Sequence, residues 1–174
     1  KEEPELFGRL CNESIKITIL TSVVLGAVLG IQVYEELDKS YLFVWIMILL
    51  SSIFFRVFLY SKVKEDPPNR KNIKRWIRYS FINTSLSAIS YGLIAASVYF
   101  INDQVAITIV YIIMAGATAG AVTVYSSLKY LSSIFIFPIL IPLIIANFLY
   151  GDINHFILAG ITLLFCYLIY SASN

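Results

Sequence analysis

Polar side chains recur along one stripe of an otherwise apolar segment, and they are the residues best placed to bind a small molecule. Asn83, Ser87, Ser90 and Ser97 follow helical spacing, and Tyr91 lies beside them. In an apolar environment such groups need partners inside the protein, so together they could line a pocket. Each hydroxyl can instead donate to a carbonyl of its own helix, which is a structural role. We take the set as the candidate wall of a binding pocket.

Other reactive residues are not spaced for catalysis, metal binding or cofactor binding. His155 is the single histidine and has no cysteine or carboxylate partner to complete a metal site, so we expect it to cap a helix at the surface. Cys11 and Cys166 are far apart in the sequence, and we expect both to be free thiols. No serine, cysteine or carboxylate pair is arranged for covalent or acid–base catalysis. The sequence predicts a chain without catalytic residues or cofactors, and nothing in it indicates nucleic-acid binding.

Two prolines interrupt one long apolar run, in the stretch FPILIPL (137–143). A proline inside a soluble helix removes an amide donor and costs about 3 kcal/mol, but membrane helices tolerate it because neighbouring groups serve the freed carbonyls. Pro138 frees the carbonyl of Ile134, and Pro142 frees that of Pro138. We predict a kinked helix whose freed carbonyls face the interior of the bundle. The prolines either fix the shape of this helix or form a hinge beside a pocket.

Small residues recur every four positions in two other apolar segments. The first contains Thr18, Ser22, Gly26 and Gly30, and the fourth contains Gly116 and Gly120. This spacing forms a flat ridge that lets another helix approach closely. The two ridges either pack on each other within the chain or mediate dimerisation. We favour packing within the chain, because the pattern is common in membrane helices.

The composition places these segments in a lipid bilayer. The 174 residues are 59% hydrophobic and 14% charged, and the mean hydropathy is +0.79, whereas globular domains are about a quarter charged. Six runs are long enough, or nearly so, to cross about 30 Å of hydrocarbon, and the last is expected to continue past Tyr170. The predicted spans are 15–34, 41–60, 76–101, 105–125, 131–150 and 155–170. None alternates like a barrel strand, so we predict an all-α, six-helix membrane protein: one domain over 1–174 with a polar cytoplasmic segment at 1–14.

The distribution of charge predicts the orientation. Lys and Arg gather before the first span and in the linker SKVKEDPPNRKNIKR (61–75), whereas acidic residues dominate the opposite ends. Basic residues stay on the cytoplasmic side, so both termini are expected there. The basic linker is read as a topology signal, with a patch for anionic lipid as the alternative. Arg56 lies one turn from the cytoplasmic end of its span and is expected to snorkel to the interface.

The two halves of the chain echo each other at an offset of 90 residues. KITILTSVVLGAVLG (16–30) aligns with AITIVYIIMAGATAG (106–120). Because three spans reverse direction, such halves would have inverted topology, which is common in secondary transporters. A transporter is therefore an alternative hypothesis. It is disfavoured because no Asp or Glu lies deep in any span to run a proton or sodium relay.

The order of several motifs resembles the six-helix membrane input region of bacterial histidine kinases and diguanylate cyclases. The motifs are FVWIMILLSSIFFRVFLY, KRWIRYSFINTSLSAISYGLIAA, MAGATAGAVTVYSSL and FIFPILIPL, between about residues 43 and 143. They share a Trp and a later Arg in span two, a Trp-x-Arg opening to span three, a small-residue span four and the paired prolines of span five. The chain departs from the pattern at Tyr91, where the family leads us to expect Trp.

The resemblance implies a sensory module in the bacterial inner membrane. Its sixth helix would lead into a cytoplasmic kinase or cyclase domain beyond residue 174, and it would act as a homodimer. The signal would be a small apolar or amphipathic molecule, or a state of the membrane itself. The candidate contacts are Trp45, Asn83, Ser87, Tyr91 and the carbonyls freed near Pro138. A dimerisation anchor without a ligand is a third hypothesis.

Overall fold

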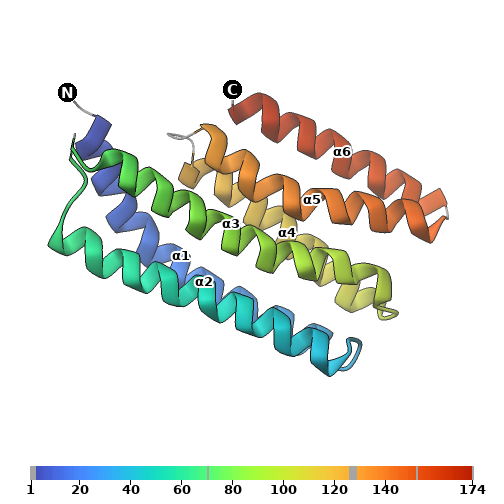
Figure 1. Cartoon of the computed structure of the whole chain (residues 1–174). Coiled ribbons are helices and arrows are strands. Elements are labelled where there is room, and N and C mark those ends of the chain that lie inside the picture. Colours follow the sequence, from blue (N-terminus) through green and yellow to red (C-terminus); the bar gives the residue numbers. More distant parts are fainter. Residues whose placement is uncertain (1–2, 70, 126–128, 152, 174) are drawn as a thin grey trace.

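The computed structural model describes residues 3–69, 71–125, 129–151 and 153–173. Over these residues the chain is helical and contains no strand, so the prediction of an all-α fold is confirmed. The helices are α1 (Glu3–Val33), α2 (Lys39–Glu65), α3 (Ile73–Ser97), η1 (Val98–Phe100), α4 (Gln104–Tyr125), α5 (Lys129–Tyr150) and α6 (Ile153–Ser173). Figure 1 shows these α-helices running side by side as one bundle.

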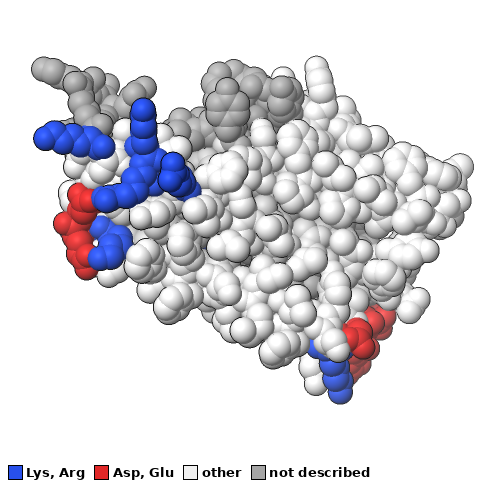
Figure 2. All heavy atoms as spheres, in the orientation of Figure 1, with Lys and Arg blue, Asp and Glu red and all other residues white. Residues whose placement is uncertain are grey.

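The outside of the bundle is apolar along most of its length. Four described helices are long and apolar enough to cross a membrane, over Lys39–Glu65, Ile73–Phe100, Gln104–Val122 and Leu131–Tyr150. Shorter apolar stretches occupy Thr18–Val33 and His155–Leu168. Figure 2 shows charged side chains at the two ends of one face, with an uncharged band between them. This surface is suited to a lipid bilayer.

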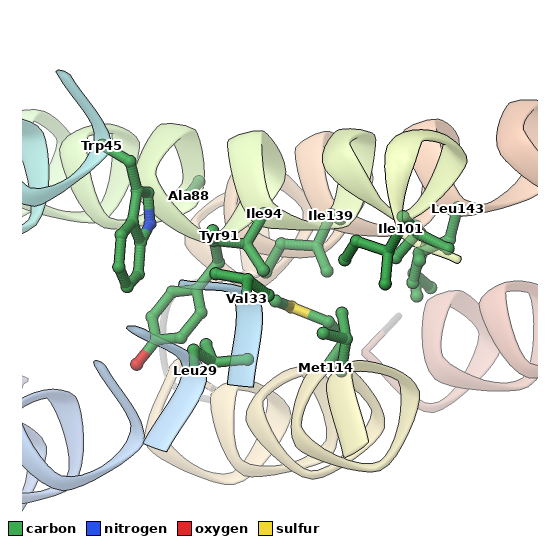
Figure 3. Close-up of a cluster of buried hydrophobic side chains, with 14 of the residues drawn as sticks. Leu29, Val33, Trp45, Ala88, Tyr91, Ile94, Ile101, Met114, Ile139 and Leu143 are labelled. Atoms are coloured by element: carbon green, nitrogen blue, oxygen red, sulfur yellow. The ribbon is translucent and has the colours of Figure 1, made fainter. Parts of the chain in front are cut away.

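α3 and α5 form the centre of the bundle. α3 packs against α2 and α5, and α5 also packs against α4 and α6. α1 packs against α2 and α4, which leaves α6 at the opposite edge (Figure 1). The buried core draws on five helices through Leu29, Trp45, Ile94, Met114 and Ile139 (Figure 3). The helices therefore surround a shared apolar core, in addition to presenting an apolar outer surface.

α2 begins at a capped turn. The Asp38 carboxylate accepts hydrogen bonds from the amides of Ser40 (2.8 Å) and Tyr41 (3.3 Å). These bonds satisfy amides that have no partner inside the helix. They also favour the charged form, so the pKa of Asp38 lies below its ordinary value, chiefly because of the Ser40 amide. The cap fixes where the polar loop ends and the apolar helix starts.

Several helices extend beyond the predicted spans at their polar ends. α1 begins at Glu3, so the polar segment predicted at 1–14 is helical from that residue onward. α2 continues past Tyr60 to Glu65, where Lys62 donates to Glu65 (2.6 Å), and Pro67 and Pro68 follow. α6 continues past residue 170 to Ser173, as predicted. Hydropathy marks the apolar part of a helix, and charged turns at its ends extend it without changing that signal.

Candidate functional site

Arg56 lies buried where α1, α2 and α3 meet. The residue is 4% exposed, and its Nη1 donates to the Thr18 carbonyl (2.9 Å) and to Ser22 Oγ (2.7 Å), both on α1. Its Nη2 donates to Ser87 Oγ on α3 (2.6 Å). The prediction that Arg56 snorkels to the interface is therefore wrong. Two neighbouring helices supply acceptors, so the protein solvates the guanidinium in place of water.

Ser87 connects Arg56 to two further groups. Its hydroxyl donates to the Asn83 carbonyl (2.9 Å) and lies 2.7 Å from Ser52 Oγ. A hydroxyl has one proton to donate, and Ser87 uses it on Asn83. Ser52 therefore donates to Ser87, which accepts from both Ser52 and Arg56. We call Arg56 with the buried Ser22, Ser52 and Ser87 the arginine cluster.

The arginine cluster carries a positive charge without a negative partner. A guanidinium stays protonated in proteins, and no described carboxylate forms an ion pair with Arg56. Arg56 is also the one charged side chain that is buried within the described part of the chain. Its Nε has no hydrogen-bond partner there. A buried charge costs several kcal/mol unless it is paired, so this arginine is a candidate binding group.

A cleft of about 490 Å³ opens onto the arginine cluster between α1 and α4. Its volume lies within the range of about 300–1,000 Å³ that is typical of small-molecule sites. Tyr91 enters it from α3 (Figure 3), with its ring edge-on to that of Phe135 at 5.9 Å. The lining residues are Thr18, Thr21, Ser22 and Leu25 on α1, Ile112, Ile113, Gly116, Ala117, Gly120 and Ala121 on α4, and Arg56, Tyr91 and Phe135 on the inner wall.

The polar stripe predicted on α3 does not form a single wall. Ser87 belongs to the arginine cluster, and Tyr91 lines the cleft. Ser97 instead donates to the Ile94 carbonyl of its own helix (2.8 Å), which is the structural role weighed from the sequence. The Asn83 backbone carbonyl accepts from Ser87, and its side-chain Oδ1 is buried without a partner among the described residues. Part of the stripe therefore belongs to the candidate site, and the rest has a structural role within the bundle.

Trp45 lies away from the cleft. Its indole donates to the Ser90 carbonyl (3.0 Å), which ties α2 to α3. The indole also borders a second, wider groove of about 1000 Å³ on the other side of α1, together with Gly26 and Leu49. Trp45 and Arg56 both lie on α2, but Trp45 borders the wider groove and Arg56 borders the cleft.

The two glycine ridges have different surroundings. A Cβ built on Gly26 would lie 2.5 Å from Leu49 Cδ2, and one on Gly30 would lie 3.5 Å from the Trp45 ring, so both face α2. Gly116 and Gly120 are exposed, and a Cβ on either would meet nothing within 4 Å. The expected packing of the two ridges on each other is therefore wrong. The ridge on α4 borders the open cleft instead.

Pro138 marks the closest approach of α3 and α5. Both prolines lie inside the continuous helix α5. A Cβ built on Gly92 would lie 2.5 Å from the Pro138 carbonyl oxygen. This carbonyl is the one that Pro142 leaves without a helical donor, and it faces α3. The prediction that it faces the bundle interior is confirmed, and the approach requires a glycine at position 92.

The contact between α5 and α6 is aromatic. His155 is half-buried and stacks on Tyr150, with ring centroids 4.3 Å apart, so it does more than cap a helix at the surface. The Tyr150 hydroxyl donates towards the carbonyls of Val98 (2.9 Å) and Ile101 (3.0 Å). Cys166 on α6 is a free thiol, whereas the side chain of Cys11 lies outside the described residues. Among the described residues no three His, Cys, Asp or Glu side chains gather as metal ligands.

From the sequence, Ser22 belongs to the small-residue ridge of the first span, and neither Ser22 nor Ser52 is predicted to bind a ligand. Ser52 precedes Arg56 by one helical turn, and Ser22 follows Thr18 by one turn, so each hydroxyl shares a face with another member of the site. That spacing was the available signal. It becomes informative only when α1 and α2 are known to be neighbours.

No protein-family model matches the chain, and neither a curated protein nor a solved structure matches it. The buried arginine cluster and the cleft beside it are therefore the basis for assigning a function.

Proposed function

We propose that this chain is a membrane-embedded receptor module that binds a small amphipathic molecule in the cleft between α1 and α4. The observation that carries the proposal is Arg56, a buried charge whose Nε is unused and which borders a cleft of small-molecule size. A ligand with a polar group would offset the cost of burying that charge. In this proposal all six helices cross a bacterial inner membrane, and both termini are cytoplasmic.

A continuous set of contacts leads from the arginine cluster to α6. Ser87 lies on α3, which meets α5 where Gly92 faces Pro138. α5 in turn meets α6 where Tyr150 stacks on His155. A ligand that binds one arrangement of α1 and α3 more tightly would shift α5 and α6 with them, and Pro138 and Pro142 are the proposed hinge.

The output is proposed to be a cytoplasmic histidine kinase or diguanylate cyclase domain that follows α6, as the family resemblance implies. Such outputs act in pairs, so the module is proposed to be a homodimer. A secondary transporter is the weaker candidate. The buried charge in the described part of the chain is an arginine, whereas a proton or sodium relay runs on carboxylates.

A chimera with a measurable output tests the receptor function. The chain is joined through α6 to a diguanylate cyclase domain, and cyclic di-GMP formation is measured in membrane vesicles. Gly116→Leu projects a side chain into the cleft from a position where a Cβ meets nothing within 4 Å. It should change the output at least about twofold, because this side chain occupies the site that sets the balance between the two packings.

Gly160→Leu on α6 is the matched control for this chimera. A Cβ there also meets nothing within 4 Å, but Gly160 lies outside the cleft, so the output should match that of the wild type. Equal output from both variants and the wild type, at equal membrane insertion, would contradict the proposal.

A further inference from the structure

We infer that the cleft takes a single-chain amphiphile whose anionic head, a carboxylate or a phosphate, pairs with Arg56. This inference rests on the proposed function, because it names the ligand class of the same site. Three observations support it: the charge of Arg56 at one end of the cleft, the unused donors of that side chain, and the mostly apolar walls that α1 and α4 contribute to the rest of the cleft.

The charge at the site selects an anion. Arg56 is buried, is always protonated and makes its hydrogen bonds to neutral oxygens of Thr18, Ser22 and Ser87. A neutral ligand could accept a hydrogen bond from Arg56 but would leave its charge unpaired. An anion would supply both the acceptor and the counter-charge, which is how buried charges in proteins are usually compensated.

The geometry of the guanidinium suits an oxyanion. Arg56 has five N–H donors and makes three hydrogen bonds, so at least two donors are unused, and Nε is one of them. Carboxylates and phosphates accept two parallel N–H···O bonds from such a fork. Arg56 lines the cleft, so an oxyanion that enters the cleft lies beside this side chain. Because Nε is itself buried, a small rotation of the guanidinium is needed to present the fork to the oxyanion.

The rest of the cleft suits one apolar chain. Thr18 and Ser22 meet Arg56 at one end, and Leu25 continues the α1 wall a turn further on. The opposite wall includes exposed Gly116 and Ile112, so the cleft is open on the outside of the bundle. A volume of about 490 Å³ is in the lower half of the range for small-molecule sites, which fits one chain better than two.

The depth of Arg56 agrees with this orientation. The residue lies one helical turn, about 6 Å, before Tyr60, the predicted end of the span. An amphiphile lying in the membrane with its head just inside that boundary would place the head at Arg56 and the chain along α1 and α4. A second copy of the chain could also fill the cleft with a helix, but the unpaired charge favours an anionic head.

Calorimetry with probes that differ only in their heads tests the inference. The full chain is reconstituted in phosphatidylcholine nanodiscs and titrated with dodecanoate, dodecyl phosphate or dodecanol, and the heat from empty nanodiscs is subtracted. We expect dodecanoate or dodecyl phosphate to bind about ten- to a hundredfold more tightly than dodecanol, as a charge-assisted hydrogen-bonded pair predicts. The stronger of the two anions identifies the head.

Four variants locate the effect. Arg56→Gln should abolish the preference for the anion, and Arg56→Lys, which keeps the charge but loses the fork, should retain part of it. Arg78→Gln removes an exposed charge from α3 and should leave the preference intact. Gly116→Leu should weaken binding of every probe. An unchanged anion preference in Arg56→Gln would overturn the inference.

Other outcomes separate this inference from the proposed function. If dodecanoate and dodecanol bind equally well and Gly116→Leu weakens both, the inference of an anionic head is overturned. The cleft would still be a ligand site. No binding of any probe would overturn both. If each nanodisc holds two copies of the protein and Gly116→Leu reduces this number to one, the cleft is instead an interface with a second copy of the chain. A loss of dodecanoate affinity when phosphatidylglycerol is added would assign it to a two-chain lipid.

Discussion

Replacing Gly92 with alanine would place a methyl group against the backbone of α5. A Cβ at this position lies 2.5 Å from the Pro138 carbonyl oxygen and 3.2 Å from its carbonyl carbon. The two helices would have to separate by about 0.9 Å to restore ordinary contact, and overpacking of this kind costs about 1–3 kcal/mol. The obstacle is backbone, which cannot turn aside, so we take the upper end of that range. Alanine returns up to about 1 kcal/mol through helix propensity, which leaves a net loss of about 2 kcal/mol.

Two other glycines provide a graded comparison. Gly26→Ala meets the end of the Leu49 side chain, which can turn about 30° away from its rotamer at a cost of about 0.5–1.5 kcal/mol. This cost nearly cancels the gain in helix propensity. Gly116→Ala meets nothing and should gain about 0.5–1 kcal/mol. The predicted order of stability is Gly116→Ala, then the wild type and Gly26→Ala together, then Gly92→Ala.

Reversible unfolding in mixed micelles of dodecyl maltoside and dodecyl sulfate, followed by circular dichroism, measures these differences. Each variant is compared with the wild type at the same mole fraction of dodecyl sulfate. If Gly92→Ala unfolds with the same free energy as Gly116→Ala, the close approach of α3 and α5 is refuted, and with it the contact proposed to pass a signal from α3 to α5.

Three further predictions concern side-chain hydrogen bonds and are checked by the same unfolding measurement. Trp45→Phe removes the donor to the Ser90 carbonyl and should cost about 1 kcal/mol; no loss would refute that bond. Ser87→Ala removes an acceptor of the charged Arg56 and should cost about 1.5–3 kcal/mol; a neutral effect would contradict the arginine cluster. Asp38→Ala should destabilise the protein at neutral pH. Because the folded pKa of Asp38 lies below 3.8, this stabilisation is complete above pH 3.8 and is lost as the pH falls through the folded value, so a pH-independent difference would contradict the cap.

The sequence predicted the helices well because a helix in an apolar solvent pairs its own backbone N–H and C=O groups in hydrogen bonds. The length of each apolar run was therefore enough to locate α4 and α5 to within two residues, whereas α2 runs five residues past the predicted end at Tyr60. The freed carbonyl of Pro138 was also predictable, since the pattern of helical hydrogen bonds depends only on local sequence.

The candidate site was predicted less well because it depends on which helices are neighbours. The position of Arg56 in its span was clear, but its burial follows from Ser22 and Ser87, which belong to other helices. The glycine ridges illustrate the same limit. Gly26 and Gly116 belong to ridges with the same four-residue spacing, yet Gly26 packs on α2 and Gly116 borders the cleft. Spacing identifies a face of a helix, and only packing determines what that face meets.

Photo-crosslinking tests the proposed binding site most directly. A dodecanoate analogue with a diazirine on its chain is added to the reconstituted protein, irradiated and located by mass spectrometry. We predict labels within residues 18–25 of α1 and 112–121 of α4, lost in Gly116→Leu and retained in Gly160→Leu. Labels confined to the groove beside Trp45, or spread over all outward-facing helices and unchanged in Gly116→Leu, would contradict a ligand site at the arginine cluster.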